Sequence, residues 1–290
     1  MRVGVQIRDF TWSGGPARLG PRLGRVAAEA DAAGFSHIAV ADHLFQVSSV
    51  GPPEQEMLEA YTTLGFLAAH TSRAKLMTLV TAVSHRHPGL LAKTVSTLDV
   101  LSGGRALLGI GAGWNAEENH GLGLPFPPVA ERFEWLEDTL RLCLSMWSRG
   151  DGPFDGTHVH AARTLNSPQP LSRPHPPIMV GGMGEHKTLR MVAKYAQACN
   201  LFPGPDLPRR LEALREHCAR EGRDYDTIEK SAYYVLDPGP KGRDVPRILD
   251  ELGALAELGI ETVIGGVPRV EDLEPLALLG EHVLPAVKEI

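Results

Sequence analysis

Eight short apolar segments recur along this chain, and each is followed by a stretch with helical periodicity. The segments that we predict to be strands are Val3–Ile7, Ser36–Ala41, Lys75–Val80, Arg105–Ile110, Pro177–Gly181, Ala198–Phe202, Lys230–Leu236 and Glu261–Gly265. The stretches between them are long enough to cross back over a parallel sheet. Eight such units in 290 residues predict an α/β fold, the (β/α)8 TIM barrel, which typically needs about 250 residues.

The composition permits a large core and excludes several classes of protein. The chain is 43% hydrophobic and 22% charged, which is typical of a folded globular protein. The net charge is −6 and no basic block occurs, so we expect no nucleic-acid partner. No apolar run approaches the roughly 18 residues of a membrane span. Because the first predicted strand begins at Val3, we expect no signal peptide and predict a cytoplasmic protein.

The cysteine and histidine spacings do not predict a metal site or a disulfide framework. The three cysteines are far apart and form no C-x-x-C motif. Two His-x-His pairs would place both rings on one face of a strand, but a third ligand is not evident for either. The residues concerned are Cys143, Cys199 and Cys218, and the pairs His85/His87 and His158/His160. We therefore expect no bound metal.

Two segments interrupt the regular alternation. Residues 150–176 are rich in proline and contain the turn sequence Phe154-Asp155-Gly156. We interpret them as a hairpin and an extended arm inserted into one barrel domain that spans residues 1–290. The segment Gln46–Glu56 follows the second strand and carries Gly51-Pro52-Pro53. Either segment is a candidate wall of a substrate pocket or an ordinary surface connection, because barrel active sites are built from loops after strands.

Asp42 and His43 end the second predicted strand. A titratable pair that leaves a buried strand faces the mouth of a barrel, where histidine can give or take a proton near neutral pH. We predict that His43 is a general acid/base and that Asp42 orients it or contacts a cofactor. The alternative is a capping aspartate beside a partly buried histidine.

Glycine-rich turns end the fourth and fifth predicted strands. The first runs from Gly109 to Ala116, and we reject a dinucleotide fingerprint there because three βα units precede it. Instead, Gly111 and Ala112 would let a flat ring approach the backbone, with Trp114 and Asn115 at its border. The second turn comprises Gly181, Gly182, Met183 and Gly184 and leads into a predicted helix Glu185–Ala196. It would hold a phosphate on free amides, or it is a tight turn without a ligand.

His85 and Arg86 follow the third predicted strand. We predict that they line the rim of the substrate pocket, where Arg86 would meet an anionic group.

Five motifs occur in an order that resembles a known family. They are Asp42-His43, His87-Pro88, Thr97–Arg105 continuing into Gly109–Trp114, Pro125–Pro128 with Glu131-Arg132-Phe133, and Pro177–Gly182. Together they resemble the luciferase-like monooxygenase superfamily, and within it the branch that uses the deazaflavin coenzyme F420. The resemblance extends from Val3 to at least Pro203.

The resemblance implies a flavin-like ring held at the C-terminal mouth of the barrel. It implies a non-prolyl cis peptide near Thr78-Leu79 behind the ring, Asp42 and His43 beside it, and the cofactor phosphate on Gly181–Gly184. Some deazaflavin enzymes have a glutamate where this chain has Trp114, which weakens any claim to sugar-phosphate dehydrogenase activity. Family members are commonly homodimers, so we expect one here.

These inferences lead to one functional prediction and two alternatives. We predict an oxidoreductase that transfers hydride between coenzyme F420 and a small organic substrate. The alternatives are an FMN-dependent monooxygenase on the same barrel and a flavin-binding barrel without turnover.

Overall fold

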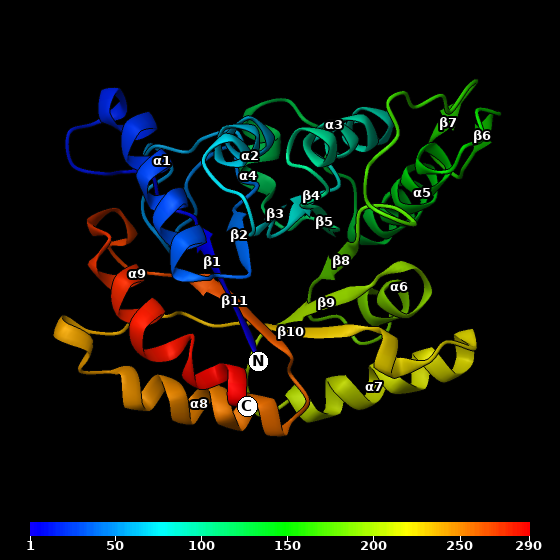
Figure 1. The fold of residues 1–290 in the computed structure, drawn as a ribbon. Coiled ribbons are helices and arrows are strands. Elements are labelled where there is room, and N and C mark those ends of the chain that lie inside the picture. Colours follow the sequence, from blue (N-terminus) through cyan, green and yellow to red (C-terminus); the bar gives the residue numbers. More distant parts are fainter.

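The computed structural model describes all 290 residues and contains a closed parallel barrel (Figure 1). Each strand of the ring is hydrogen-bonded to its neighbours, and the pairing of Leu76 and Met77 with Ala106 and Leu107 closes the ring. The strands are β1 (Arg2–Ile7), β2 (His37–Val40), β3 (Lys75–Thr78) continued by β4 (Thr81–Ala82), β5 (Ala106–Gly111), β8 (Ile178–Gly181), β9 (Ala198–Leu201), β10 (Glu229–Tyr233) and β11 (Thr262–Gly266). The predicted (β/α)8 barrel and all eight of its strands are confirmed.

Helices surround the barrel, with the short α4 following β5 (Figure 1). They are α1 (Pro16–Ala33), α2 (Ala60–Ala69), α3 (Pro88–Leu101), α4 (Ala116–Gly121), α5 (Val129–Trp147), α6 (Thr188–Tyr195), α7 (Leu207–Glu221), α8 (Val245–Glu257) and α9 (Glu274–Leu278). The predicted apolar stripe of α5 is buried at Leu136, Leu140 and Trp147. The predicted start of α6 at Glu185 is wrong, because Glu185–Lys187 form a turn before the helix begins at Thr188.

The barrel interior is filled by a small apolar cluster that is separate from the core between strands and helices. Its members come from six strands: Ala39, Met77, Leu107, Met179, Ala198 and Ile264. Close approach of neighbouring strands also demands glycine. A Cβ on Gly109 of β5 would lie 2.0 Å from the Thr78 carbonyl oxygen of β3. The filled interior directs any ligand to the mouth of the barrel rather than through it.

The segment between α5 and β8 forms a hairpin and then an extended arm. The hairpin strands are β6 (Phe154–Asp155) and β7 (His160–Ala161), and the buried Asp138 accepts hydrogen bonds from the His158 and Val159 amides. The arm is fastened by Asp99, whose carboxylate accepts from the Leu171 and Ser172 amides at 2.7 and 2.8 Å. These bonds fix the inserted segment against α3 and α5.

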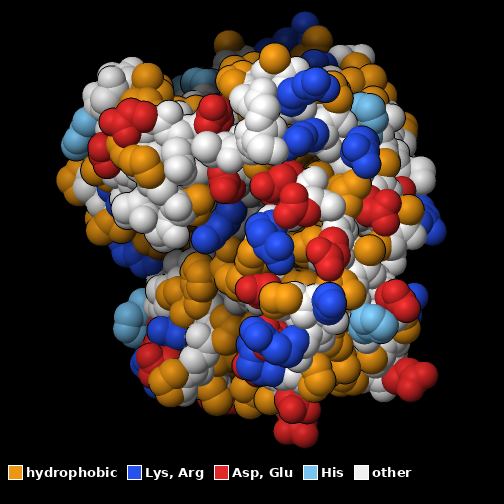
Figure 2. Space-filling view, turned by 90° about the vertical axis from the view of Figure 1, so that its left-hand side faces the viewer, with side chains coloured by type: hydrophobic (Ala, Val, Ile, Leu, Met, Phe, Trp, Pro, Cys, Tyr) orange, Lys and Arg blue, Asp and Glu red, His pale blue; other side chains and the backbone are white.

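No helix of the chain combines the length and apolarity needed to cross a membrane. The face of the molecule that carries α1 and α9 displays acidic and basic side chains interspersed, without a large block of one sign (Figure 2).

His37, at the start of β2, predicts a pH-dependent stability. Burial, with the positive charges of Arg2 and Lys75 nearby, lowers its pKa from 6.5 to about 4. Between these two values the unfolded chain binds a proton that the folded chain excludes. The free energy of unfolding should therefore fall as the pH drops through this window, by about 1.4 kcal/mol per pH unit.

Urea unfolding of the wild type and of His37→Gln, from about pH 7 to about pH 4.5, measures this slope. The variant should lose less stability on acidification, whereas His120→Gln, at an exposed position, should behave like the wild type. Equal slopes in all three proteins would rule out His37 as the source.

Candidate active site

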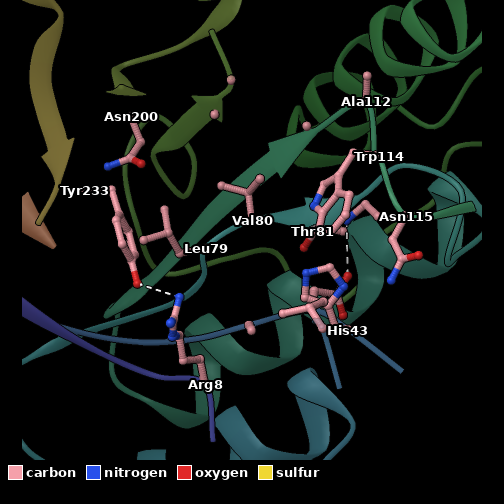
Figure 3. A pocket seen from close by; sticks show the side chains of 18 of the residues that line it. Arg8, His43, Leu79, Val80, Thr81, Ala112, Trp114, Asn115, Asn200 and Tyr233 are labelled. Atoms are coloured by element: carbon pink, nitrogen blue, oxygen red, sulfur yellow. Dashed lines mark hydrogen bonds between the residues drawn. The ribbon is translucent and has the colours of Figure 1, made fainter. Parts of the chain in front are cut away.

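A cavity of about 640 Å³ opens at the C-terminal ends of the strands (Figure 3). This volume lies in the range of pockets that hold cofactors and small ligands. Nine of the residues predicted to form the site line it: Asp42, His43, Leu79, Gly111, Ala112, Trp114, Asn115, Gly181 and Gly182. Five others do not line it: Thr78, His85, Arg86, Met183 and Gly184.

His43 is held by a buried glutamate that the sequence analysis missed. Its Nδ1 lies 2.8 Å from Oε1 of Glu118, and the other oxygen of Glu118 accepts from the amides of Leu44 at 2.7 Å and Phe45 at 3.3 Å. Burial tends to raise the pKa of Glu118, but the hydrogen bonds from His43 and these amides hold it below its usual value. Glu118 is therefore an anion that fixes the imidazole and leaves Nε2 without a protein partner.

Trp114 forms the other contact of the His43 ring. The two ring centroids are 5.4 Å apart with planes at 76°, an edge-to-face arrangement. The indole is 66% exposed although it lines the cavity. Trp114 thus leaves a large apolar surface open at the mouth, next to the acid/base candidate (Figure 3).

Asp42 does not orient His43, contrary to one of its two predicted roles. Its carboxylate is paired with the Arg86 guanidinium through two bonds of 2.7 and 2.8 Å. Arg86 also pairs with Glu59 and is absent from the cavity lining. The prediction that Arg86 meets an anionic ligand in the pocket is therefore wrong, since its charge is already neutralised.

The histidine pairs are likewise engaged within the chain. His85 is fully buried between two acids, with Nδ1 at 3.6 Å from Asp42 Oδ2 and Nε2 at 3.7 Å from Glu118 Oε1. His158 pairs with Glu134 and His160 with Asp155 in the inserted hairpin. His85 thus stands behind the site rather than at its rim.

The floor of the cavity is the segment between β3 and β4. A non-prolyl cis peptide joins Leu79 to Val80, one residue later than the predicted Thr78-Leu79. Two glycines make room for Val80: a Cβ on Gly181 would lie 2.9 Å from Val80 Cγ1, and one on Gly111 would lie 3.2 Å from Cγ2. The floor is therefore apolar and lacks side chains at Gly111 and Gly181, which leaves room for a planar ligand above it.

Thr78 lies beneath this floor. It is buried, and its hydroxyl bonds the Gly109 carbonyl and the Thr81 hydroxyl at 2.9 and 2.6 Å. It supports the floor without facing the cavity.

The turn after β8 carries free backbone donors. Gly182 has a φ of 135°, a conformation that favours glycine, and its amide donates to the Asn200 carbonyl. The next amides, of Met183, Gly184 and Glu185, have no acceptor within the chain. Thr188, at the start of α6, lines the cavity beside Gly181 and Gly182. A run of free amides before a helix is a suitable environment for a phosphate.

The wall opposite His43 contains polar residues that the sequence analysis missed. Arg8 follows β1, and its Nη1 donates to the Tyr233 hydroxyl at 3.0 Å (Figure 3). Asn200 lies in β9, one residue before its end, and donates to the Ser231 hydroxyl at 3.0 Å. The signal available in the sequence was position alone: Arg8 lies just beyond the predicted strand Val3–Ile7, and Asn200 lies within the predicted strand Ala198–Phe202.

Comparison with known proteins identifies the family of the chain. A family model described as luciferase-like monooxygenase matches residues 1–236. An uncharacterised protein of Mycobacterium tuberculosis is 31% identical over 214 residues, covering 73% of this chain and 70% of that protein. An F420-dependent glucose-6-phosphate dehydrogenase of Kineococcus radiotolerans is 30% identical over 223 residues, covering 72% of this chain and 62% of that enzyme.

Solved structures share the fold. An F420-dependent secondary alcohol dehydrogenase in complex with an F420–acetone adduct superimposes with a TM-score of 0.80 at 18% identity, covering 99% of each chain. The extent of the family match, together with the barrel and the cavity at its mouth, identifies this chain as a member of the luciferase-like monooxygenase family.

Proposed function

We propose that this protein is an oxidoreductase that exchanges hydride between coenzyme F420 and a small organic substrate. The observation that carries the proposal is the His43–Glu118 pair: an imidazole fixed by a buried carboxylate, with Nε2 free, at the edge of a ring-sized cavity. Interconversion of a carbonyl and an alcohol needs one hydride and one proton, so it needs such a proton donor or acceptor. The 30% identity to an F420-dependent dehydrogenase adds support.

The residues of the cavity fit a deazaflavin. The apolar floor at Leu79 and Val80 suits a flat ring. The free amides of Met183 and Gly184, in the turn just beyond the lining residue Gly182, suit a phosphate. When bound, a deazaflavin supplies a carbon centre that carries hydride and reacts poorly with oxygen. The protein's tasks are then to position the substrate and to supply the proton.

His43 performs the proton transfer in this proposal. For reduction, Nε2 donates a proton to the substrate oxygen as hydride reaches the carbon, and for oxidation both move in reverse. Glu118 keeps the ring oriented through Nδ1, so that Nε2 is presented to the cavity. Trp114 flanks the ring of His43 and shields the reacting atoms from part of the solvent.

Reduced-cofactor oxidation distinguishes this proposal from the FMN-dependent monooxygenase. Purified protein is mixed with reduced F420 or reduced FMN and a panel of ketones and aldehydes, once anaerobically and once with oxygen. Mixtures without protein measure the spontaneous oxidation of each reduced ring. We expect anaerobic oxidation of reduced F420 that depends on a carbonyl compound. A product that has gained an oxygen atom, formed only with FMN and oxygen, would support the monooxygenase. No turnover above the protein-free rate with either cofactor would support a non-catalytic barrel.

We also propose a homodimer formed through α2 and α3. The two helices pack side by side, and α2 contains no charged residue. The two charges of α3 are engaged, because Lys93 bonds the Ser167 carbonyl and Asp99 is buried. Their outer faces instead expose Phe66 and Leu90, at 38% and 60%. A charge-free surface of this kind is typical of a subunit interface.

Light scattering should therefore give twice the mass of 31.4 kDa for the wild type. Leu90→Lys should shift the mass toward the monomer, while Leu258→Lys, at an exposed leucine beyond α8, should leave it unchanged. A wild-type monomer at all concentrations would contradict the dimer.

A further inference from the structure

We propose that Arg8 and Tyr233 form an anion-recognition subsite in the wall of the cavity that faces His43. The subsite would bind a negatively charged oxygen, supplied either by a carboxylate of the substrate or by the pyrimidine carbonyl of the reduced ring. The inference rests on the proposed function for the identity of the ring, but not for the existence of the subsite.

The charge balance of the cavity points to Arg8. Five titratable side chains line it, and both acids among them already have partners: Asp42 pairs with Arg86, and Glu118 pairs with His43. Arg8 has no carboxylate within 4.0 Å, and its one side-chain hydrogen bond goes to the neutral Tyr233 hydroxyl. A guanidinium carries five N–H donors, so four remain for a ligand or for water.

The backbone and the packing around Arg8 hold it in place. The buried Gln46 donates to the Arg8 carbonyl at 3.2 Å. Gly266, at the end of β11, lies beside both side chains: a Cβ there would be in van der Waals contact with them, 3.6 Å from Arg8 Nε and 3.5 Å from the Tyr233 hydroxyl. The side chains of Arg8 and Tyr233 therefore meet next to Gly266, which has no side chain.

The free groups of Arg8 and Tyr233 are hydrogen-bond donors, so they favour a ligand that only accepts hydrogen bonds. The Tyr233 hydroxyl accepts from Arg8 Nη1, so its own proton is directed elsewhere and joins the remaining guanidinium donors. Phe202 flanks Tyr233 with ring centroids 5.4 Å apart and is 50% exposed, which adds an apolar side to the subsite. Planar oxyanions match a guanidinium fork beside a second donor, whereas ammonium groups do not.

The location of the subsite defines the substrate class. Figure 3 shows Tyr233 to the left of Leu79 and Arg8 below it, with His43 and Trp114 to the right of Val80. A substrate that contacts both sides carries its anionic group away from the carbon that exchanges hydride. We therefore assign the substrates to the class of organic acids whose carbonyl or alcohol group is separate from the carboxylate. If the ring of the cofactor supplies the charged oxygen, the subsite binds the ring instead.

Binding measurements on Arg8→Gln separate these two sources. Fluorescence titration gives the Kd of oxidised and of reduced F420 for each protein. Calorimetry then gives the Kd of benzoate and benzamide, and of phenylacetate and phenylacetamide, with and without the cofactor. Arg8→Lys keeps the positive charge but removes the planar guanidinium, and Tyr233→Phe removes the second donor. Arg18→Gln is the matched control, because Arg18 is an exposed arginine of α1 outside the cavity. Thermal unfolding confirms that each variant folds.

If the substrate is the source, the carboxylates should bind the wild type at least about tenfold more tightly than their amides, and Arg8→Gln should abolish that preference. If the ring is the source, Arg8→Gln should raise the Kd of reduced F420 at least about tenfold more than it raises the Kd of oxidised F420. Arg18→Gln should change neither. The proposal is overturned if Arg8→Gln changes neither quantity. Failure of the wild type to bind F420 would instead refute the proposed cofactor, while the carboxylate measurements on the free protein still test the subsite.

Discussion

Replacing His43 by alanine is expected to lower turnover by about 10²–10⁴-fold, the range for removal of a general acid/base. Its Nε2 is the imidazole atom left free at the cavity, because Nδ1 is held by Glu118 at 2.8 Å. The Kd for F420 should change little, since the floor at Leu79 and Val80 is untouched. Stopped-flow oxidation of reduced F420 with the best carbonyl substrate, beside a binding titration, measures both quantities.

Two further variants show whether the loss of turnover in His43→Ala comes from the loss of proton transfer. Glu118→Gln keeps the shape but removes the charge that faces the imidazole, so turnover should fall at least about tenfold, though less than in His43→Ala. His120→Ala removes an exposed histidine of the same short helix α4 and should leave turnover unchanged. Wild-type turnover in His43→Ala would remove this residue from the mechanism.

The second large effect is expected from Gly182→Val. At a φ of 135° a side chain is strained, and a Cβ would lie 3.3 Å from Thr188 Cγ2. The branched side chain would displace the turn and cover the free amides of Met183 and Gly184. We expect the Kd for the cofactor to rise by about a hundredfold or more, because several charge-assisted hydrogen bonds to the phosphate are lost together.

Gly204→Val separates the loss of the phosphate site from backbone strain. Gly204 has a φ of 154°, a Cβ there would have no neighbour within 4 Å, and the residue is absent from the cavity lining. Its replacement should cost stability without changing the Kd. If Gly182→Val and Gly204→Val bind the cofactor equally well, the phosphate lies elsewhere.

The fold and the position of the site follow from the sequence because both depend on local patterns. Each apolar run is a strand buried on both faces, so it is visible without knowledge of its neighbours. Parallel strands in a barrel end at the same rim, so residues at strand ends, such as His43, Gly111 and Gly181, come together whatever the details.

The partnerships within the site could not be predicted in the same way. Asp42 and His43 are adjacent in the sequence, but Asp42 pairs with Arg86 and His43 pairs with Glu118, so the two side chains have separate partners. Glu118 meets His43 from a six-residue helix whose direction depends on the preceding turn. Arg8 carries no motif, and its importance lies in the absence of an acidic neighbour, which only the packed structure reveals.

Comparative titration with the two cofactors tests the central claim most directly. Purified protein, stripped of bound chromophore, is titrated with F420 and separately with FMN, and ligand fluorescence is followed to saturation. We expect saturable binding of F420, at least about tenfold tighter than that of FMN and lost in Gly182→Val. Tighter binding of FMN, or no binding of F420, would contradict it.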